Sequence, residues 1–129
     1  MPVILGYDGK SHTEKALNYA IGHALAYNSA LYIVSSVATK DSVDRESDIR
    51  NMKEYVEAAR QRAADAGVDA HPLIEVGSPA DAIIAAARRV DADTIIVGRF
   101  DKTALDRMMI GSVSEKVIRN AHCTVIVVQ

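Results

Sequence analysis

The chain has no tryptophan, a single phenylalanine and a single cysteine. One cysteine, Cys123, excludes an internal disulfide framework and is consistent with a reducing compartment. Its simplest role is that of a small packed side chain. An excess of charge of one sign is also lacking, because 15 Lys and Arg stand against 17 Asp and Glu. Without a basic stripe, and with few aromatic side chains, the sequence predicts no nucleic-acid partner.

Long apolar runs are absent as well. The longest runs have only the length of a strand, so we expect no membrane-spanning segment. The first residues, PVILGY, lack a charged region followed by a long apolar core, so we expect no signal peptide and a cytoplasmic location. A length of 129 residues fits one domain, which we expect to cover residues 1–129.

Patterns of metal and catalytic sites are missing too. No spacing typical of metal ligands links the four histidines, which are His12, His23, His71 and His122. The sequence shows no Ser-His-Asp order, paired carboxylates or nucleophile elbow. Gly9-Lys10-Ser11 is similar to a P-loop, but the glycine that this loop requires is replaced by Ile4. We therefore expect no metal site built from histidines and no rapid catalysis.

What the chain does have is a regular alternation of strand and helix patterns. Short apolar runs predict five strands, at residues 3–5, 30–37, 68–76, 94–97 and 124–128. One-sided apolar stripes predict four helices, at residues 11–26, 48–66, 79–89 and from 112 onward. S-x-x-E capping boxes predict Ser11 and Ser112 as helix N-caps, and Gly77-Ser78-Pro79 predicts the start of the third helix. The charge-dense residues 38–47 are expected to form a surface loop.

This alternation predicts a fold. Buried strands that alternate with helices form a parallel sheet covered on both faces, a three-layer, doubly wound α/β fold. Pro72 cannot donate a hydrogen bond to a sheet ladder, so the third strand belongs at an edge. The economical strand order is then 3-2-1-4-5. Ligands bind where the strand order reverses, which here is between Gly6-Tyr7-Asp8 and Gly98-Arg99.

The C-terminal part, residues 94–129, adds a candidate anion site. Gly98 follows a buried strand, and Gly111 precedes a helix whose free N–H groups and dipole favour a phosphate. A plainer interpretation is that Gly98 only ends a strand and Ser112 only caps a helix. Asp8 has two interpretations also, as a ligand contact or as the acceptor of a local Asx turn.

Several motifs together resemble the universal stress protein family over the whole chain. They are an aspartate after the first strand, a charged loop after the second, G-S-P before the third helix and the tail VGRFDKTALDRMMIGSVSEKVIRNAHCTVIVV. The family's nucleotide motif is Gly, two residues, Gly, nine residues, Gly, then Ser or Thr. Gly98 fills the first position, and Gly111 with Ser112 fills the last pair. Asp101 stands where the middle glycine is expected.

The resemblance implies an adenine-nucleotide α-hydrolase-like fold and a sensor or regulator in the stress response that binds ATP, with at most slow ATP hydrolysis. Its implied roles are contact with base and ribose for Tyr7 and Asp8, and backbone contact with the adenine edge for Val37. Gly98 and Arg99 would meet the ribose and phosphate. The remaining implied residues hold the phosphates: Gly111, Ser112, Val113 and Ser114.

Asp101 leaves the phosphate contacts open. A carboxylate beside phosphates costs about 1 to 4 kcal/mol of Coulomb energy, depending on screening. Asp101 could instead point to solvent or help to hold a Mg²⁺ ion, and Arg99, Lys102 and Arg107 could offset its charge.

The alternative to a nucleotide-binding protein is a dimeric interaction module of the same fold that binds no nucleotide. A third hypothesis is an enzyme that acts on a phosphorylated small molecule. Residues of the same loop, Leu105, Met108, Met109 and Ile110, are expected to pack it onto the domain.

The last strand, residues 124–128, would lie at a sheet edge, where an apolar strand is a pairing liability. In the family that it resembles, this edge forms an antiparallel dimer. The resemblance therefore implies a homodimer, in addition to a regulatory protein partner that the sequence leaves unknown. The implied interface consists of Val125, Ile126, Val127 and Val128.

Overall fold

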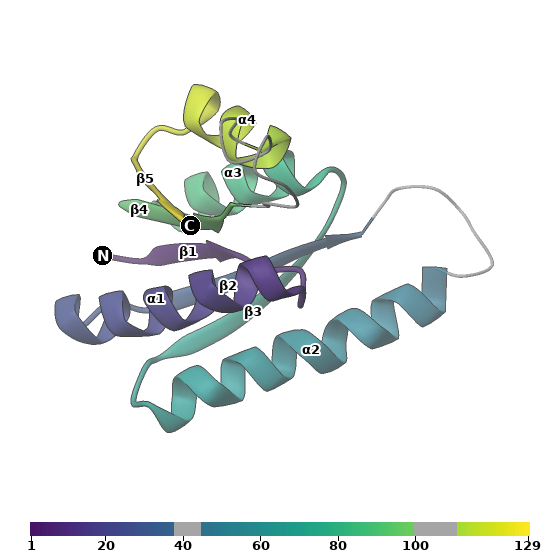
Figure 1. Ribbon diagram of the computed structural model, residues 1–129, viewed down its shortest axis with the longest axis horizontal. Coiled ribbons are helices and arrows are strands. Elements are labelled where there is room, and N and C mark those ends of the chain that lie inside the picture. The colour runs from purple at the N-terminus through teal and green to yellow at the C-terminus, as the bar shows by residue number, and fades with distance from the viewer. Residues whose placement is uncertain (38–44, 100–110) are drawn as a thin grey trace.

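Strands and helices alternate along the chain in the computed structural model, which describes residues 1–37, 45–99 and 111–129 (Figure 1). In chain order the elements are β1 (Val3–Gly6), α1 (Ser11–Tyr27), β2 (Leu31–Val37), α2 (Arg45–Asp65), β3 (Ala70–Val76), α3 (Pro79–Arg89), β4 (Thr94–Gly98), α4 (Ser112–Asn120) and β5 (Thr124–Val128). The type and order of the predicted elements are confirmed. The largest difference in a boundary is at α2, which begins three residues before the predicted start at Asp48.

The five strands form one parallel sheet in the order β3-β2-β1-β4-β5, so the predicted order is confirmed. β1 is central, and Leu5 lies opposite Ile33 on one side and Ile96 on the other. β3, which contains Pro72, and β5 are the two edge strands. The order reverses between β1 and β4, as the sequence predicted.

Helices cover both faces of the sheet. Figure 1 shows α1 and α2 on one side of the sheet and α3 and α4 on the other. Alternate strand residues supply the two cores: Leu5, Ile33 and Ile96 pack under α1 and α2, whereas Ile4 and Ile95 pack under α3 and α4. This sorting follows from the period of two in a strand. None of the helices in the described part of the chain is long and apolar enough to cross a membrane.

Both predicted capping boxes are wrong. Lys10 and Gly111 are the N-caps of α1 and α4, neither with a side-chain capping bond, so Ser11 and Ser112 are the first helical residues instead. The glutamates of the two boxes are bound elsewhere. The Glu14 side chain accepts hydrogen bonds from Tyr7 and Arg62. The start of α3 agrees with the prediction in position, because Ser78 is its N-cap and Pro79 its first residue.

The side-chain hydrogen bond of Ser78, at the start of α3, differs from that of an ordinary N-cap residue. The Ser78 hydroxyl donates to a carboxylate oxygen of Asp81, at 2.8 Å, rather than accepting a bond from a backbone N–H group. Asp81 in turn pairs with Lys116 of α4, at 3.0 Å. The first turn of α3 is therefore connected to α4, which lies on the same face of the sheet.

Candidate functional site

A cleft of about 500 Å³ opens at the carboxyl ends of β1, β2 and β4. The first turns of three helices surround it, which are α1 through His12 and Thr13, α3 through Pro79 and Ala82, and α4 through residues 112–114. Its volume lies in the range typical of small-molecule sites. The cleft thus lies at the reversal of strand order, where a doubly wound sheet binds its ligands.

The structure brings together seven of the nine residues to which the sequence resemblance gave a role in binding. Those that line the cleft are Tyr7, Asp8, Gly98, Gly111, Ser112, Val113 and Ser114. Val37 and Arg99 are not in its wall. The Val37 carbonyl accepts a hydrogen bond from the Gly77 N–H at 2.9 Å, and the Arg99 N–H donates to the Val128 carbonyl at 2.9 Å. The ligand contacts of all nine residues stay predictions.

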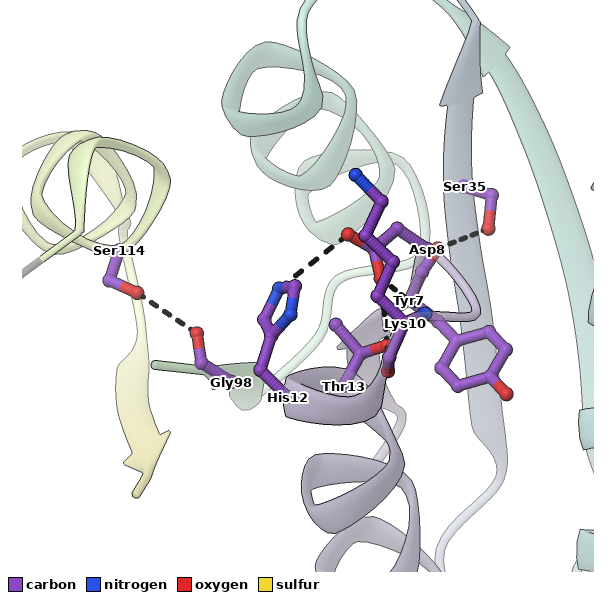
Figure 2. A network of polar contacts seen from close by, with 8 residues as sticks. All are labelled: Tyr7, Asp8, Lys10, His12, Thr13, Ser35, Gly98 and Ser114. Carbon is purple, nitrogen blue, oxygen red and sulfur yellow. Dashed lines mark hydrogen bonds and ion pairs between the residues drawn. The ribbon is translucent and has the colours of Figure 1, made fainter. Parts of the chain in front are cut away.

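Asp8 forms the predicted local Asx turn, and it also lines the cleft. One carboxylate oxygen accepts from the Lys10 N–H at 2.8 Å, which closes an Asx turn, and from the Thr13 hydroxyl at 2.9 Å. The second oxygen lies 3.5 Å from Nε2 of His12 (Figure 2). These contacts hold the carboxylate at the cleft wall in one orientation. Its local role therefore does not compete with a ligand contact.

Tyr7 lines the cleft and is held in place by hydrogen bonds at its backbone carbonyl and at its phenol. Its backbone carbonyl accepts a hydrogen bond from the Ser35 hydroxyl, and its phenol donates to Glu14, which also pairs with Arg62. Burial, followed by the hydrogen bond to Glu14, raises the pKa of the Tyr7 phenol far above its usual value. The rings of Tyr7 and Tyr55 meet edge to face, with centroids 5.8 Å apart. Tyr7 stays neutral and presents an aromatic surface at neutral pH.

The packing of the protein itself requires a glycine at position 98. A Cβ at this position would lie 2.5 Å from the backbone oxygen of His12 and 3.4 Å from Cα of Thr13. The end of β4 is thus in direct backbone contact with the first turn of α1. Gly111 differs, because a Cβ there would meet no atom of the described residues within 4 Å, and its φ of −64° suits any residue. Space inside the protein alone therefore does not require a glycine at position 111.

The N-terminus of α4 supplies donors for an anion. The first hydrogen bond of this helix runs from the Glu115 N–H to the Gly111 carbonyl, at 2.9 Å. The N–H groups of residues 112–114 therefore have no partner within the helix. Ser114 is buried, and its hydroxyl donates to the Gly98 carbonyl at 3.3 Å, which attaches α4 to the end of β4. This arrangement favours a phosphate at the first turn of α4.

Part of the predicted site lies outside the described residues. This holds for Asp101 and its suggested Mg²⁺ ion, for Lys102 and Arg107, and for the apolar residues 105 and 108–110. Within residues 1–37, 45–99 and 111–129, no cluster of three or more His, Cys, Asp or Glu side chains could hold a metal ion.

Sequence reasoning missed more than half of the cleft wall. The missed residues are Lys10, His12, Thr13, Val34, Ser35, Ser36, Tyr55, Pro79, Ala82, Ile83 and Val97. Two polar residues at the end of an otherwise apolar strand, Ser35 and Ser36, were a usable signal, since the carboxyl ends of parallel strands meet at one edge. Nothing near Tyr55 in the sequence indicates that α2 would bring its ring beside Gly9, whose added Cβ would lie 3.0 Å from Cγ of Tyr55.

Comparisons with known proteins agree with this architecture. The family model for the universal stress protein family matches residues 1–129. A universal stress protein of Methanocaldococcus jannaschii is 30% identical, with 98% of this chain and 81% of that protein covered. A solved universal stress protein of Archaeoglobus fulgidus in complex with dAMP is 28% identical, with a TM-score of 0.80 and coverage of 100% and 98%. Another, solved in complex with cAMP, is 25% identical, with a TM-score of 0.79 and coverage of 100% and 97%. The chain belongs to the universal stress protein family.

Proposed function

We propose that the cleft binds an adenine nucleotide, with ATP as the physiological ligand, and that the protein is a sensor or regulator in a stress response. The observation that carries the proposal is the position of the α4 N-terminus beside Asp8 and Gly98 in one cleft. The similar proteins solved with dAMP and cAMP support the class of ligand, because both ligands are adenine nucleotides.

Different parts of the cleft wall suit the base, the ribose and the phosphates of an adenine nucleotide. Val34, Ile83 and Val97 supply apolar surface for a base. Asp8 offers a carboxylate oxygen to ribose hydroxyl groups, and the N–H groups at the start of α4 would receive the phosphates. Mg²⁺ bound with ATP would be held by the phosphates and Asp101. One domain covering residues 1–129 is sufficient for this site.

Binding rather than rapid turnover is the expected activity. In the described wall, the hydroxyls of Ser35 and Ser114 donate to backbone carbonyls, and that of Thr13 donates to the Lys10 carbonyl and to Asp8. None of these acceptors is the imidazole base of a nucleophilic triad. We therefore propose regulation by occupancy, with ATP hydrolysis slow at most. The readout would pass to partner proteins through a cytoplasmic homodimer that pairs β5 with β5.

Isothermal titration with ATP, with and without Mg²⁺, tests this function on the wild type and on Asp101→Gly. Micromolar binding by both proteins supports the proposal. Binding by the variant alone would favour the alternative, an interaction module that lost its nucleotide because of Asp101. Product formation at many turnovers per minute would instead indicate an enzyme.

A further inference from the structure

His12 places an imidazole in the cleft beside the Asp8 carboxylate. Nε2 of His12 lies 3.5 Å from Oδ2 of Asp8, and the two side chains are 19% and 43% exposed. The backbone of His12 contacts Gly98, whose carbonyl accepts the Ser114 hydroxyl. His12 therefore connects Asp8 with the strand end to which α4 is attached (Figure 2).

Asp8 poses an electrostatic problem for an anionic ligand. A phosphate in this cleft meets the negative charge of Asp8, and the donors that bind Asp8, the Lys10 amide and the Thr13 hydroxyl, carry no net charge. In the described wall, the titratable or charged side chains are Tyr7, Asp8, Lys10, His12 and Tyr55. The structure shows an ion pair to Asp8 from His12 alone among them. His12 is thus the group best placed to cancel the Asp8 charge.

We propose that His12 is a nucleotide-contacting residue whose protonation neutralises Asp8, so that the cleft binds nucleotide phosphate more tightly at mildly acidic than at alkaline pH. This inference rests on the proposed function of the same cleft. Protonation of an imidazole adds both a positive charge and a second N–H donor. For a partly solvated charge a few ångströms from a phosphate, we expect about a tenfold change in affinity.

Calorimetric titration with cAMP between pH 5.5 and pH 8 tests the inference. The phosphodiester of cAMP keeps one charge over this range, whereas a phosphate monoester titrates near pH 6 and would confuse the result. We expect cAMP to bind the wild type about tenfold more tightly at pH 5.5 than at pH 8. Adenosine, which has no phosphate, should bind with the same affinity throughout.

Two substitutions of His12 separate the effect of its charge from the effect of its shape. His12→Gln should bind cAMP weakly at every pH, and His12→Arg should bind it tightly at every pH. A matched control is His71→Gln, because His71 forms a similar pair with Asp69, Nε2 to Oδ1 at 3.0 Å, at the opposite end of the sheet. This control should keep the pH dependence of the wild type. Thermal melts establish that each variant is folded, and His12→Gln decides the question if His12→Arg is not.

The outcomes separate this inference from the function on which it rests. Equal cAMP affinity of the wild type at pH 5.5 and pH 8, or a full pH dependence in His12→Gln, would overturn the role of His12 and leave nucleotide binding intact. Failure of the wild type to bind cAMP, ATP or adenosine at any pH would overturn both proposals.

Discussion

The main chain of Gly98 packs directly against the main chain of His12, with space for no side chain between them. This contact joins the end of β4 to the first turn of α1, the two elements on either side of the switch point. The glycine that begins the nucleotide motif therefore has a structural role before any ligand binds. At Gly111, the last glycine of the same motif, an added Cβ would meet no atom of the described part of the chain within 4 Å. The two glycines should consequently respond differently to the same substitution.

Gly98→Ala should destabilise the protein and weaken nucleotide binding together. The new Cβ would lie 2.5 Å from the His12 oxygen, so β4 and α1 must move apart. Overpacking of this kind costs about 1 to 3 kcal/mol of unfolding free energy. Urea denaturation of the ligand-free protein measures the loss. An unchanged midpoint and slope would contradict the close contact.

Gly111→Ala should leave stability nearly unchanged and reduce nucleotide affinity. An alanine fits the extended backbone and meets none of the described neighbours within 4 Å, so the unfolding free energy should change by less than about 1 kcal/mol. The Cβ would hinder a phosphate at the start of α4, and we expect about a tenfold loss of ATP affinity, comparable to one charge-assisted hydrogen bond. Undiminished affinity, measured by calorimetry, would place the phosphate elsewhere.

Glu14→Gln should remove part of the acid sensitivity of folding. Hydrogen bonds from Tyr7 and then from Arg62 hold the pKa of Glu14 below its usual 4.5. A lowered folded-state pKa gives stability that is present above pH 4.5 and is lost as the pH falls through the folded value. We expect a loss of about 1 kcal/mol at pH 6, discounted because Glu14 is partly exposed, and a smaller difference from the wild type at pH 3.

Glu57→Gln is the control for this prediction, because Glu57 pairs with Arg60 on the exposed face of α2 alone. Urea denaturation at pH 3 and pH 6 measures all three proteins. A constant difference between the wild type and Glu14→Gln at both pH values would show that Glu14 contributes through packing and not through its charge.

Val127→Pro should convert the proposed homodimer to monomers. The Val128 carbonyl accepts a hydrogen bond from the N–H of Arg99, the residue that follows β4. With the period of two, the backbone polar groups of Val125 and Val127 therefore point to the free edge. Proline at position 127 removes an outward N–H without removing a bond to β4. Sedimentation should give twice 13.9 kDa for the wild type and 13.9 kDa for the variant. A wild-type monomer at micromolar concentration would refute the dimer.

The sequence was sufficient for the topology because each strand and helix carries its own pattern. Pro72 indicated one edge of the sheet, and the alternation of elements determined the switch point. Helix starts were less certain, because the capping boxes depend on Glu14 and Glu115, which form other bonds. Glu14 pairs with Tyr7 and with Arg62, a residue 48 positions away, and local sequence carries no sign of that partner.

The candidate site, like the fold, could be predicted from the sequence only in part. The residues of β1, β4 and α4 at the cleft could be found from strand ends and glycines. Those from α2 and α3, such as Tyr55 and Ile83, reach the cleft through tertiary packing. His12 and Asp8 are only four residues apart, but their pairing within the cleft depends on how α1 begins, one residue earlier than an N-cap at Ser11 would imply.

Backbone amide NMR during a titration with ATP tests the central claim most directly. If the cleft binds adenine nucleotides, the amides of residues 6–13, Gly98 and residues 111–114 should shift together and saturate. A second hollow, lined by Tyr19, His23 and Thr124 near β5, should remain unaffected. Absence of saturable shifts in the cleft at millimolar ATP, or shifts confined to that second hollow, would contradict the account.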